Sequence, residues 1–370
     1  MVVNESYLED FREMFSEELK NAGIVGGAFV FSRDGSPLIR IEHGFANINS
    51  KELVDQDTIF HWASNTKTLT GIAIMQLQDK GLLSLDDAVT DYLPEISSIR
   101  NPFGSTDDIT IRHLMNHSSG LRNPTYPYKL GLPSEPFEPT EYAQLEATFP
   151  VTELFFKPGD RFGYSNLGIV FLGRIIEKLS GGEYQTYIDM NIFQPLDMCR
   201  SYFDRTPSNL MRHRSHSYYI ENGNLREGIF DVDTGITVSN GGLNSTIGDM
   251  MKYFEFIVGN DSKENPVLSR KSLLEMLEPS IDSNTDANGY RGLTSGVGLA
   301  FFFDRDGEEM FFGHGGDQNG FISYTEFNLK RKTYSIMVLN TTVLRSEENE
   351  DGDDVVMKLR RATRKLHQSF

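Results

Sequence analysis

Ser64 and Lys67 stand three residues apart at the start of a stretch with helical periodicity. Apolar residues such as Leu69 and Ile72 recur at helical spacing, and Gly81 supplies a stop signal. A helix of this extent places Ser64 in its first turn and Lys67 on the same face. The hydroxyl would then sit beside an amine that can accept its proton, near helix N–H groups that favour negative charge. Such an arrangement can produce a nucleophile.

The Ser-x-x-Lys spacing is weak evidence by itself, because a chain of this length contains such a pair by chance about once. Two further patterns add weight to it. Tyr-Ser-Asn at 164–166 lies on a predicted loop just before a second helical stretch, 167–179. His-Gly-Gly at 314–316 closes a predicted strand. The three patterns together, rather than any one of them, predict a catalytic site.

In this order the patterns resemble the signature of the penicillin-binding and serine β-lactamase superfamily, which is Ser-x-x-Lys, then Ser-Asp-Asn, then Lys-Thr-Gly. Tyr-x-Asn in the second place resembles the branch of class C β-lactamases, D-peptidases and esterases. The surrounding sequence is also similar over about residues 10–340. The similar segments outside the three patterns are Phe60–Ala63, Asn116–Leu121, Lys157–Gly159 and Gly241–Leu243.

The resemblance implies that Ser64 attacks a carbonyl carbon and forms an acyl-enzyme. For Lys67 to act as the base, its pKa must fall from about 10.4 to near neutrality, through burial or neighbouring hydrogen bonds. Alternatively Lys67 stays cationic and lowers the pKa of Tyr164, whose phenolate then takes the proton. The pair would titrate as a coupled unit, so the sequence leaves the base open. Asn166 is implied to orient Lys67 and the substrate amide.

His314, Gly315 and Gly316 stand where many members of the superfamily carry Lys-Thr-Gly. The two glycines allow a strand edge to approach the backbone of a substrate. The resemblance further implies an oxyanion hole made by the backbone N–H groups of Ser64 and Asp317. His314 could instead serve as a hydrogen-bond donor or a local acid. These residues are the candidate substrate-binding set, together with Asn166.

The departure from Lys-Thr-Gly affects the expected substrate. Losing a permanent cation and a hydroxyl weakens recognition of the carboxylate of a penicillin-like molecule. Asp317, beside the implied oxyanion hole, disfavours anionic substrates further. Arg161 or Arg291 could still supply a positive charge. Cleavage of another amide or ester is therefore favoured over β-lactam hydrolysis.

The sequence thus predicts a serine hydrolase that acts through an acyl-enzyme on a D-amino-acid peptide or a small ester. Two alternatives remain open. One is an acyltransferase or transpeptidase of biosynthesis that uses the same nucleophile. The other is a catalytically silent relative that binds a ligand or serves as a scaffold. The expected partner is a small molecule or short peptide, and the sequence does not indicate an oligomeric state.

Strand patterns near both ends of the chain must position these residues. The first pair, 27–32 and 38–41, flanks a hairpin signal at Asp34-Gly35. The last group comprises 297–303, 310–314, 321–329 and 333–339. Helical patterns fill much of the middle, at 109–116, 167–179, 184–193, 246–258 and 270–277, with others near the termini. Residues 101–150 are otherwise rich in loops, with apolar anchors at Tyr126, Tyr128 and Phe137.

These patterns predict an α/β (α+β) fold, an antiparallel sheet built from both chain termini, flanked by helices and carrying an inserted, largely α-helical region. Residues 1–75 and 285–370 are expected to form the sheet region. Residues 76–284 are expected to form the insertion. Together they would make one catalytic domain.

Composition limits the other functions. The net charge of −18 and pI near 4.9 argue against nucleic-acid binding, which needs a basic surface. The single cysteine, Cys199, excludes an internal disulfide or a cysteine-based metal cluster. His113 and His117 could share a helical face, but without a third ligand a structural role is favoured. We therefore expect no metal or other cofactor. A signal segment and an apolar membrane span are not recognisable, which predicts a soluble, cytoplasmic protein, with a secreted form whose signal has been removed as the alternative.

Overall fold

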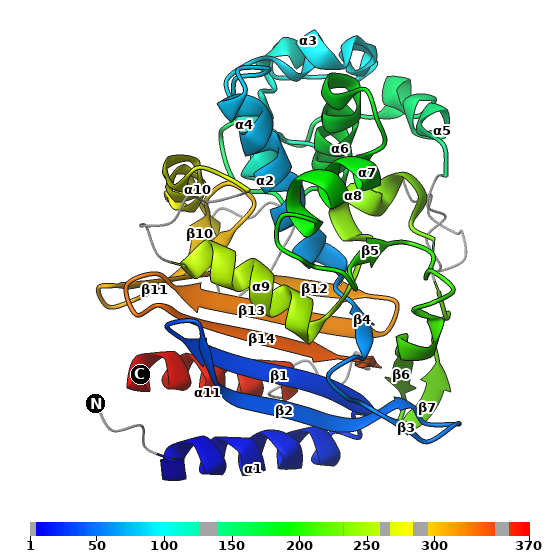
Figure 1. Ribbon diagram of the computed structural model, residues 1–370. Helices are drawn as coiled ribbons and strands as arrows, with labels where there is room; N and C mark the ends of the chain where they lie inside the picture. Colours follow the sequence, from blue (N-terminus) through cyan, green and yellow to red (C-terminus); the bar gives the residue numbers. More distant parts are fainter. Residues whose placement is uncertain are drawn as a thin grey trace.

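A nine-stranded antiparallel sheet lies at the centre of the molecule, with helices on both faces (Figure 1). The computed structural model describes residues 5–123, 125, 140–231, 233–259, 267–283, 295–344 and 355–370. The strand order is β3-β2-β1-β14-β13-β12-β11-β10-β9. The strand bounds are β1 Gly26–Arg33, β2 Ser36–Asn47, β3 Glu52–Leu53, β9 Ile281–Asp282, β10 Gly296–Val297, β11 Phe302–Asp306, β12 Glu309–Gln318, β13 Phe321–Asn328 and β14 Thr333–Leu339.

The sheet is built from the two ends of the chain. Strand β1 pairs with β14 in an antiparallel register that places Gly27 opposite Leu339 and Arg33 opposite Thr333. Strands β1 and β2 form the predicted hairpin around Asp34 and Gly35, both of which have a positive φ. The predicted fold class, an antiparallel sheet made from both termini and flanked by helices, is therefore confirmed.

Two terminal helices cover one face of this sheet, α1 Glu5–Asn21 and α11 Val355–Ser369 (Figure 1). Alternate residues of β1 point to opposite faces, so Phe29 and Phe31 pack with the two terminal helices. Ala28 and Val30 belong to the core on the other face. Because both faces are covered, β1 is buried along nearly its whole length and lacks a polar–apolar alternation.

The other face carries α9 Ile247–Val258 and, beyond it, the inserted helical region (Figure 1). Helix α2, Thr66–Asp79, runs through the centre of this region and is buried on every side from Thr66 to Leu77. The other α-helices of the region are α3 Val89–Tyr92, α4 Ile111–Met115, α5 Tyr142–Glu146, α6 Asn166–Ser180, α7 Tyr184–Ile188, α8 Val238–Gly241 and α10 Arg270–Leu277. Ser165 caps α6 by accepting from the Gly168 N–H at 3.0 Å, and Thr246 caps α9 by accepting from the Asp249 N–H.

The prediction of one strand over 297–303 is wrong. The chain reverses between β10 and β11, and the two short strands pair with each other. The turn is closed by the Gly298 N–H, which donates to the Phe301 carbonyl at 2.8 Å, and Ala300 has a left-handed φ of 63°. Apolar residues on both sides of a buried turn look like one continuous strand, because nothing polar marks the reversal.

The sequence patterns did not predict two small sheets. One contains β4 Ile59–His61, β8 Leu243–Thr246 and β5 Tyr202–Phe203. The other contains β15 Thr341–Leu344, β6 Tyr218–Glu221 and β7 Asn224–Glu227. The helix predicted over 184–193 also differs, since α7 ends at Ile188 and continues as a π-helical segment, Asp189–Phe193. Tyr126, Tyr128, Phe137, Arg291 and the predicted boundary at 284/285 lie outside the described residues.

Candidate active site

Ser64 lies in a short 3₁₀ turn, η1 Ala63–Asn65, directly before α2. The prediction of Ser64 in the first α-helical turn is thus wrong by two residues, since α2 begins at Thr66. Ala63 has a positive φ of 47°, which is uncommon for a residue with a side chain and interrupts the chain just before the helix. Ser64 is partly exposed while both of its neighbours are buried. The turn therefore presents the hydroxyl at the surface of an otherwise closed core.

Hydrogen bonds from two sheets fix this turn. The backbone N–H of Trp62 donates to the Leu243 carbonyl at 2.8 Å, and its indole Nε1 donates to the Ser245 carbonyl at 2.9 Å. On the other side, Ser323 Oγ donates to the Trp62 carbonyl at 2.9 Å. Trp62 is fully buried. The segment before Ser64 is consequently held between β8 and β13.

Asn65 connects the same turn to the strand that carries His314. Its Nδ2 donates to Ser323 Oγ at 2.8 Å, and its Oδ1 accepts from Thr325 Oγ1 at 2.9 Å. Thr325 Oγ1 also accepts a hydrogen bond of 3.3 Å from the His314 backbone N–H. All of these groups are buried, where each satisfied polar atom avoids a desolvation penalty. The network fixes the Ser64 turn relative to β12 and β13.

Lys67 makes the contact expected of a base. Its Nζ lies 2.9 Å from Ser64 Oγ and 2.7 Å from the Asn240 carbonyl oxygen. The side chain is fully buried. Burial penalises the cation and holds the pKa of Lys67 well below its usual value. The Asn240 carbonyl can only accept, so one N–H of Lys67 is directed at it.

Tyr164 lies beside this pair. Lys67 Nζ is 5.1 Å from the centroid of the Tyr164 ring, which is 8% exposed. The tyrosine precedes the N-cap residue of α6, so the start of this helix sets its position. The structure therefore brings Ser64, Lys67 and Tyr164 together from three separate segments.

Asn166 is the first residue of α6, and the oxygen of its side chain plays no part in holding the lysine. Within the described part of the chain, its Oδ1 is buried and has no hydrogen-bond partner. Its backbone carbonyl accepts from Asn240 Nδ2 at 3.4 Å. The lysine is held instead by the backbone carbonyl of Asn240, which the sequence analysis missed. Any residue type has a carbonyl, so only the similarity around Gly241–Leu243 pointed to this segment.

His314 is buried on β12 in a defined tautomer. Its Nδ1 lies 2.5 Å from the Gly315 carbonyl oxygen, so Nδ1 carries the proton and Nε2 is an acceptor. Burial, followed by the field of Lys67, lowers the pKa of His314 to about 3. Its Nε2 is buried without a partner among the described residues. The Nδ1 proton is thus used by the Gly315 carbonyl, and at neutral pH only Nε2 remains, as an acceptor.

Gly316 explains how β12 comes close to the nucleophile. A Cβ atom on Gly316 would lie 2.4 Å from the Trp62 carbonyl oxygen and 3.1 Å from Ala63 Cβ. Asp317 follows with an exposed side chain and pairs with Ile322 of β13. The predicted segment 314–317 therefore lies directly beside the Ser64 turn. Arg161 stacks on the Phe156 ring at 4.9 Å.

The position of His117 also differs from the sequence prediction. It does not share a helical face with His113, because α4 ends at Met115 and His117 has a left-handed φ of 57°. His113 instead accepts from the Thr110 N–H at the start of α4. The ring of His117 lies 4.5 Å from the ring of Tyr164. The similarity of Asn116–Leu121 to the superfamily was the available signal for this contact.

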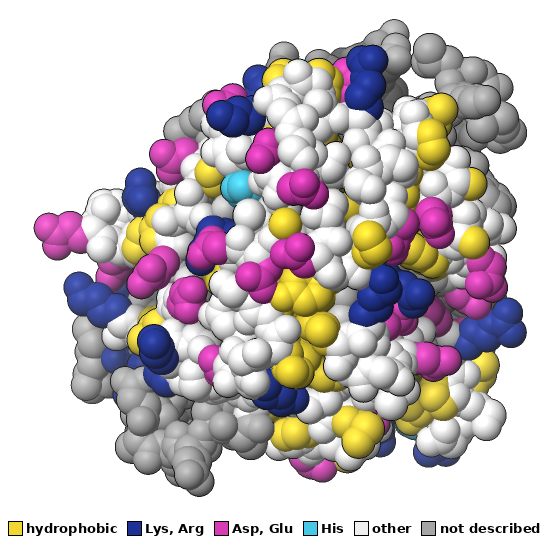
Figure 2. Space-filling view, turned by 90° about the horizontal axis from the view of Figure 1, so that it is seen from above, with side chains coloured by type: hydrophobic (Ala, Val, Ile, Leu, Met, Phe, Trp, Pro, Cys, Tyr) yellow, Lys and Arg dark blue, Asp and Glu magenta, His cyan; other side chains and the backbone are white. Residues whose placement is uncertain are grey.

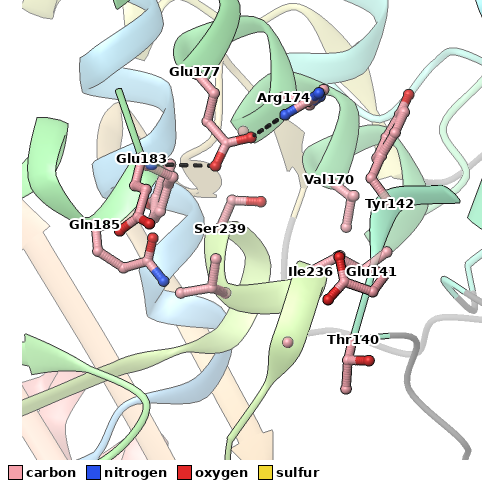
Figure 3. Close-up of a pocket in the computed structure, with 14 residues that line it drawn as sticks. Thr140, Glu141, Tyr142, Val170, Arg174, Glu177, Glu183, Gln185, Ile236 and Ser239 are labelled. Atoms are coloured by element: carbon pink, nitrogen blue, oxygen red, sulfur yellow. Dashed lines mark hydrogen bonds and ion pairs between the residues drawn. The ribbon is translucent and has the colours of Figure 1, made fainter. Parts of the chain in front are cut away.

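A cavity of about 360 Å³ lies next to this site (Figure 3). Its lining includes Tyr142, Val170, Arg174, Glu177, Glu183 and Ser239. Arg174 and Glu177 are paired along its wall at 2.9 Å. None of the described lining residues is Ser64, Lys67 or Tyr164, although Ser239 directly precedes Asn240. The cavity is therefore a neighbour of the candidate site and not part of it.

The surface and the helices add three negative observations. On the face shown in Figure 2, acidic and basic side chains are interspersed and the negative charge is not gathered into one patch. Among the described residues, no three His, Cys, Asp or Glu side chains are grouped so that they could hold a metal ion. No helix in the described part of the chain combines the length and apolarity needed to cross a membrane.

Sequence comparison links this geometry to known proteins. A family model described as Beta-lactamase matches residues 11–356. Protein flp of Staphylococcus aureus is 26% identical over 329 residues, which are 88% of this chain and 61% of that protein. Penicillin-binding protein 4* of Bacillus subtilis is 27% identical over 254 residues, which are 64% of this chain and 52% of that protein. The chain thus spans about half to three fifths of the length of these curated relatives.

Solved structures are similar over most of the chain. The octameric penicillin-binding protein homologue from Pyrococcus abyssi has a TM-score of 0.77 and 26% identity, covering 90% of this chain and 73% of that one. The D-amino acid amidase from Ochrobactrum anthropi SV3 has a TM-score of 0.76 and 19% identity, covering 97% and 99%. At this identity the second similarity concerns the fold alone.

Proposed function

Because this chain belongs to the Beta-lactamase family, we propose that it is a serine hydrolase that cleaves amide or ester bonds through an acyl-enzyme on Ser64. The observation that supports this most directly is the distance of 2.9 Å between Lys67 Nζ and Ser64 Oγ in a partly exposed turn. A buried amine next to an accessible hydroxyl is the pairing that nucleophilic catalysis needs.

In the first step, Ser64 Oγ attacks the substrate carbonyl carbon and its proton passes to the neutral Lys67 Nζ. The Asn240 carbonyl, 2.7 Å from Nζ, holds the amine in place and stabilises the ammonium that forms. The tetrahedral intermediate then expels its amine or alkoxide, which takes up the proton from Lys67 directly or through the Tyr164 hydroxyl. Water reverses the sequence and releases the acid.

We assign the base to Lys67 rather than to a Tyr164 phenolate. Burial holds the pKa of Lys67 well below its usual value, which supports a neutral amine at neutral pH. Tyr164 then acts as a neutral phenol that hands the proton on to the leaving group. The position of Lys67 Nζ over the Tyr164 ring, 5.1 Å from its centroid, supports a role for the two side chains in the same step.

The oxyanion would be bound by the backbone N–H groups of Ser64 and Asp317. The close approach of Gly316 to Trp62 supports this assignment, because it brings β12 against the turn that contains Ser64. Glycine at 316 is therefore part of the proposed oxyanion geometry. Backbone donors in a rigid turn and a sheet need little reorganisation when charge develops.

The proposed substrate is an amide of a D-amino acid or short D-peptide, or a small ester, in preference to a β-lactam. Asn166 Oδ1 is buried and has no partner among the residues that the structure describes, which favours a substrate that brings an N–H donor. His314 is a neutral acceptor and Asp317 is exposed beside it, so neither attracts a carboxylate. The D configuration is carried over from the D-amino acid amidase, a protein whose fold this chain shares.

A labelling experiment tests the proposal. The wild-type protein, Ser64→Ala and the exposed control Ser97→Ala are incubated with a fluorophosphonate and analysed by peptide mass spectrometry. We expect an adduct on Ser64 in the wild type and in Ser97→Ala. Absence of an adduct in the wild type overturns the proposal. Labelling of Ser64→Ala as strong as that of the wild type also overturns it.

Substrate class is tested with p-nitrophenyl esters, D- and L-aminoacyl anilides and nitrocefin. The expected order is D-anilide or ester above nitrocefin, and the activity disappears with Ser64→Ala. Added amines that divert the acyl group from water would identify an acyltransferase instead. Tight binding without turnover or labelling would identify a silent ligand-binding protein.

A further inference from the structure

His117 contacts both neighbours of Tyr164. Its backbone carbonyl accepts from the Gly163 N–H at 2.8 Å, and its imidazole Nδ1 accepts from the Ser165 N–H at 3.2 Å. The tyrosine is the residue between these two donors. A single histidine therefore fixes the backbone on either side of Tyr164.

The ring of His117 also packs on the tyrosine itself. The two ring centroids are 4.5 Å apart with an angle of 35° between the planes. Phe162 and Phe302 enclose the same imidazole at 6.0 and 6.3 Å. The histidine is 1% exposed. Rotation of the phenol ring away from Lys67 would thus disturb a closed aromatic group.

The backbone conformation of His117 makes these contacts possible. Its φ of 57° lies in the left-handed region, which is unfavourable for a residue with a side chain. In this conformation the carbonyl and the imidazole of one residue both reach the 163–165 segment. Strain of this kind is found where surrounding contacts hold a functional geometry.

The contacts also define the protonation of His117. Because Nδ1 accepts a hydrogen bond from a backbone amide, the neutral ring must carry its proton on Nε2. Burial holds the pKa of His117 well below its usual value, and a positive charge on Lys67 of α2 or His314 of β12 would lower it further. A cationic ring would lose the hydrogen bond to Ser165 and would repel a protonated Lys67.

We propose that neutral His117 is a positioning residue for the reaction of Ser64: it holds Tyr164 beside Lys67 through both flanking amides and the face of the phenol ring. This inference rests on the proposed hydrolase function. Among the described contacts, His117 makes no hydrogen bond to Ser64 or Lys67. It therefore acts only through Tyr164. Its loss should slow proton transfer while leaving substrate binding largely intact.

The tautomer is tested without reference to activity. In protein labelled with ¹⁵N-histidine, His117 should show an unprotonated Nδ1 and a protonated Nε2 from pH 8 down to pH 5. Assignment comes from the spectrum of His117→Asn, which lacks the resonances. A protonated Nδ1, or an imidazolium at pH 6, overturns the proposal even if the enzyme is active.

Kinetics test the positioning role. His117→Ala removes the acceptor and the ring, and we expect kcat to fall about 10²-fold with KM changed less than about threefold, as for a small misplacement of a reacting group. His117→Asn keeps an acceptor near Nδ1 and tolerates a left-handed φ, so it should recover part of kcat. Recovery by asparagine separates positioning from simple loss of packing.

The matched control is His113→Asn, because His113 lies four residues earlier in α4 and its ring accepts from the Thr110 N–H instead of packing on Tyr164. It should keep the kcat of the wild type. If His117→Ala does not fold, the comparison of His117→Asn with His113→Asn decides. An unchanged kcat in His117→Asn and His117→Ala, or an equal fall in His113→Asn, contradicts the positioning role. Absence of Ser64 labelling in the wild type would instead contradict the proposed function, and the tautomer would still be measurable.

Discussion

Gly316 of β12 packs against the backbone of Trp62, leaving 2.4 Å between a hypothetical Cβ and the carbonyl oxygen. Contacts this short do not occur for real Cβ atoms, so the strand can lie here only without a side chain. Trp62 is two residues before Ser64, and Gly316 is one residue before Asp317. The contact therefore sets the distance between the nucleophile and the strand proposed to bind the oxyanion.

Replacing Gly316 with alanine should push β12 away from the Ser64 turn. The displaced atom would be backbone, so the strain is not relieved by a side-chain rotation, and we expect kcat to fall about 10²-fold or more. Gly182→Ala is the control, because Gly182 lies outside the site and a Cβ there meets no atom within 4 Å. Equal activity of the two variants in an ester assay would show that the contact does not set the site.

Lys67→Met should abolish activity and change how stability depends on pH. Loss of a general base lowers kcat by about 10²–10⁴-fold. In the unfolded chain lysine titrates near 10.5, whereas burial holds the pKa of Lys67 well below that value in the folded state. Between these two values the unfolded state binds the extra proton, so the free energy of unfolding of the wild type rises with pH.

Between pH 7 and pH 10, the free energy of unfolding of Lys67→Met should rise less than that of the wild type. Chemical denaturation at several pH values measures it, and the difference in slope removes contributions from other groups. Parallel curves for the two proteins would mean that Lys67 is a normal cation in the folded state.

Arg364→Met should be among the more damaging changes outside the site. Arg364 on α11 makes hydrogen bonds of 2.6 and 2.9 Å to the two oxygens of Glu326, which is 3% exposed. Burial by itself raises the pKa of Glu326, but the hydrogen bonds and charge of Arg364 and the hydrogen bond from Tyr324 leave it below its usual value. Removing the guanidinium leaves a buried charge and should cost about 3–5 kcal/mol.

Urea denaturation at pH 7 measures this cost. Adding Glu326→Gln to Arg364→Met should recover part of it, since the uncompensated charge is removed. Arg100→Met is the exposed control, because its ion pair with Glu153 lies at the surface and is worth about 0–1 kcal/mol. A similar small loss for Arg364→Met would contradict the prediction.

Acid should unfold the protein through its buried histidines. Burial lowers the pKa of His61 and of His367 to about 4, and that of His314 to about 3. Below pH 6.5 the unfolded chain gains protons that the folded state does not, so stability falls as the pH falls towards 4. Each histidine contributes about 1.4 kcal/mol per pH unit well below 6.5. In His367→Gln, the slope of the free energy of unfolding against pH should fall by one such contribution. An unchanged slope would contradict this prediction.

Local patterns sufficed for much of this molecule. The spacing of Ser64 and Lys67 is a property of a helix start, and the strand patterns near both termini reflect alternation or burial, so the sheet was predictable. The 3₁₀ turn was not, because the positive φ of Ala63 depends on contacts with β8 and β13. The small sheets and the turn at Gly298 likewise depend on partners distant in the sequence.

The candidate site was likewise predictable from the sequence only in part. Side chains in recognisable motifs were found, whereas the carbonyl of Asn240 was not, because the identity of a residue says nothing about its backbone oxygen. The contact of His117 with Tyr164 depends on a left-handed residue and on the packing of two loops. No periodicity reveals either of them.

The pairing of β1 with β14 has a consequence for how the protein is made. Gly27 lies opposite Leu339, so the middle of the sheet joins segments that leave the ribosome far apart in time. Until the last strands are synthesised, β1 has an unpaired edge and an uncovered apolar face, which favours association with other chains. Such distant contacts also slow folding. A nascent chain of this protein would therefore expose that edge and face until its C-terminal strands emerge.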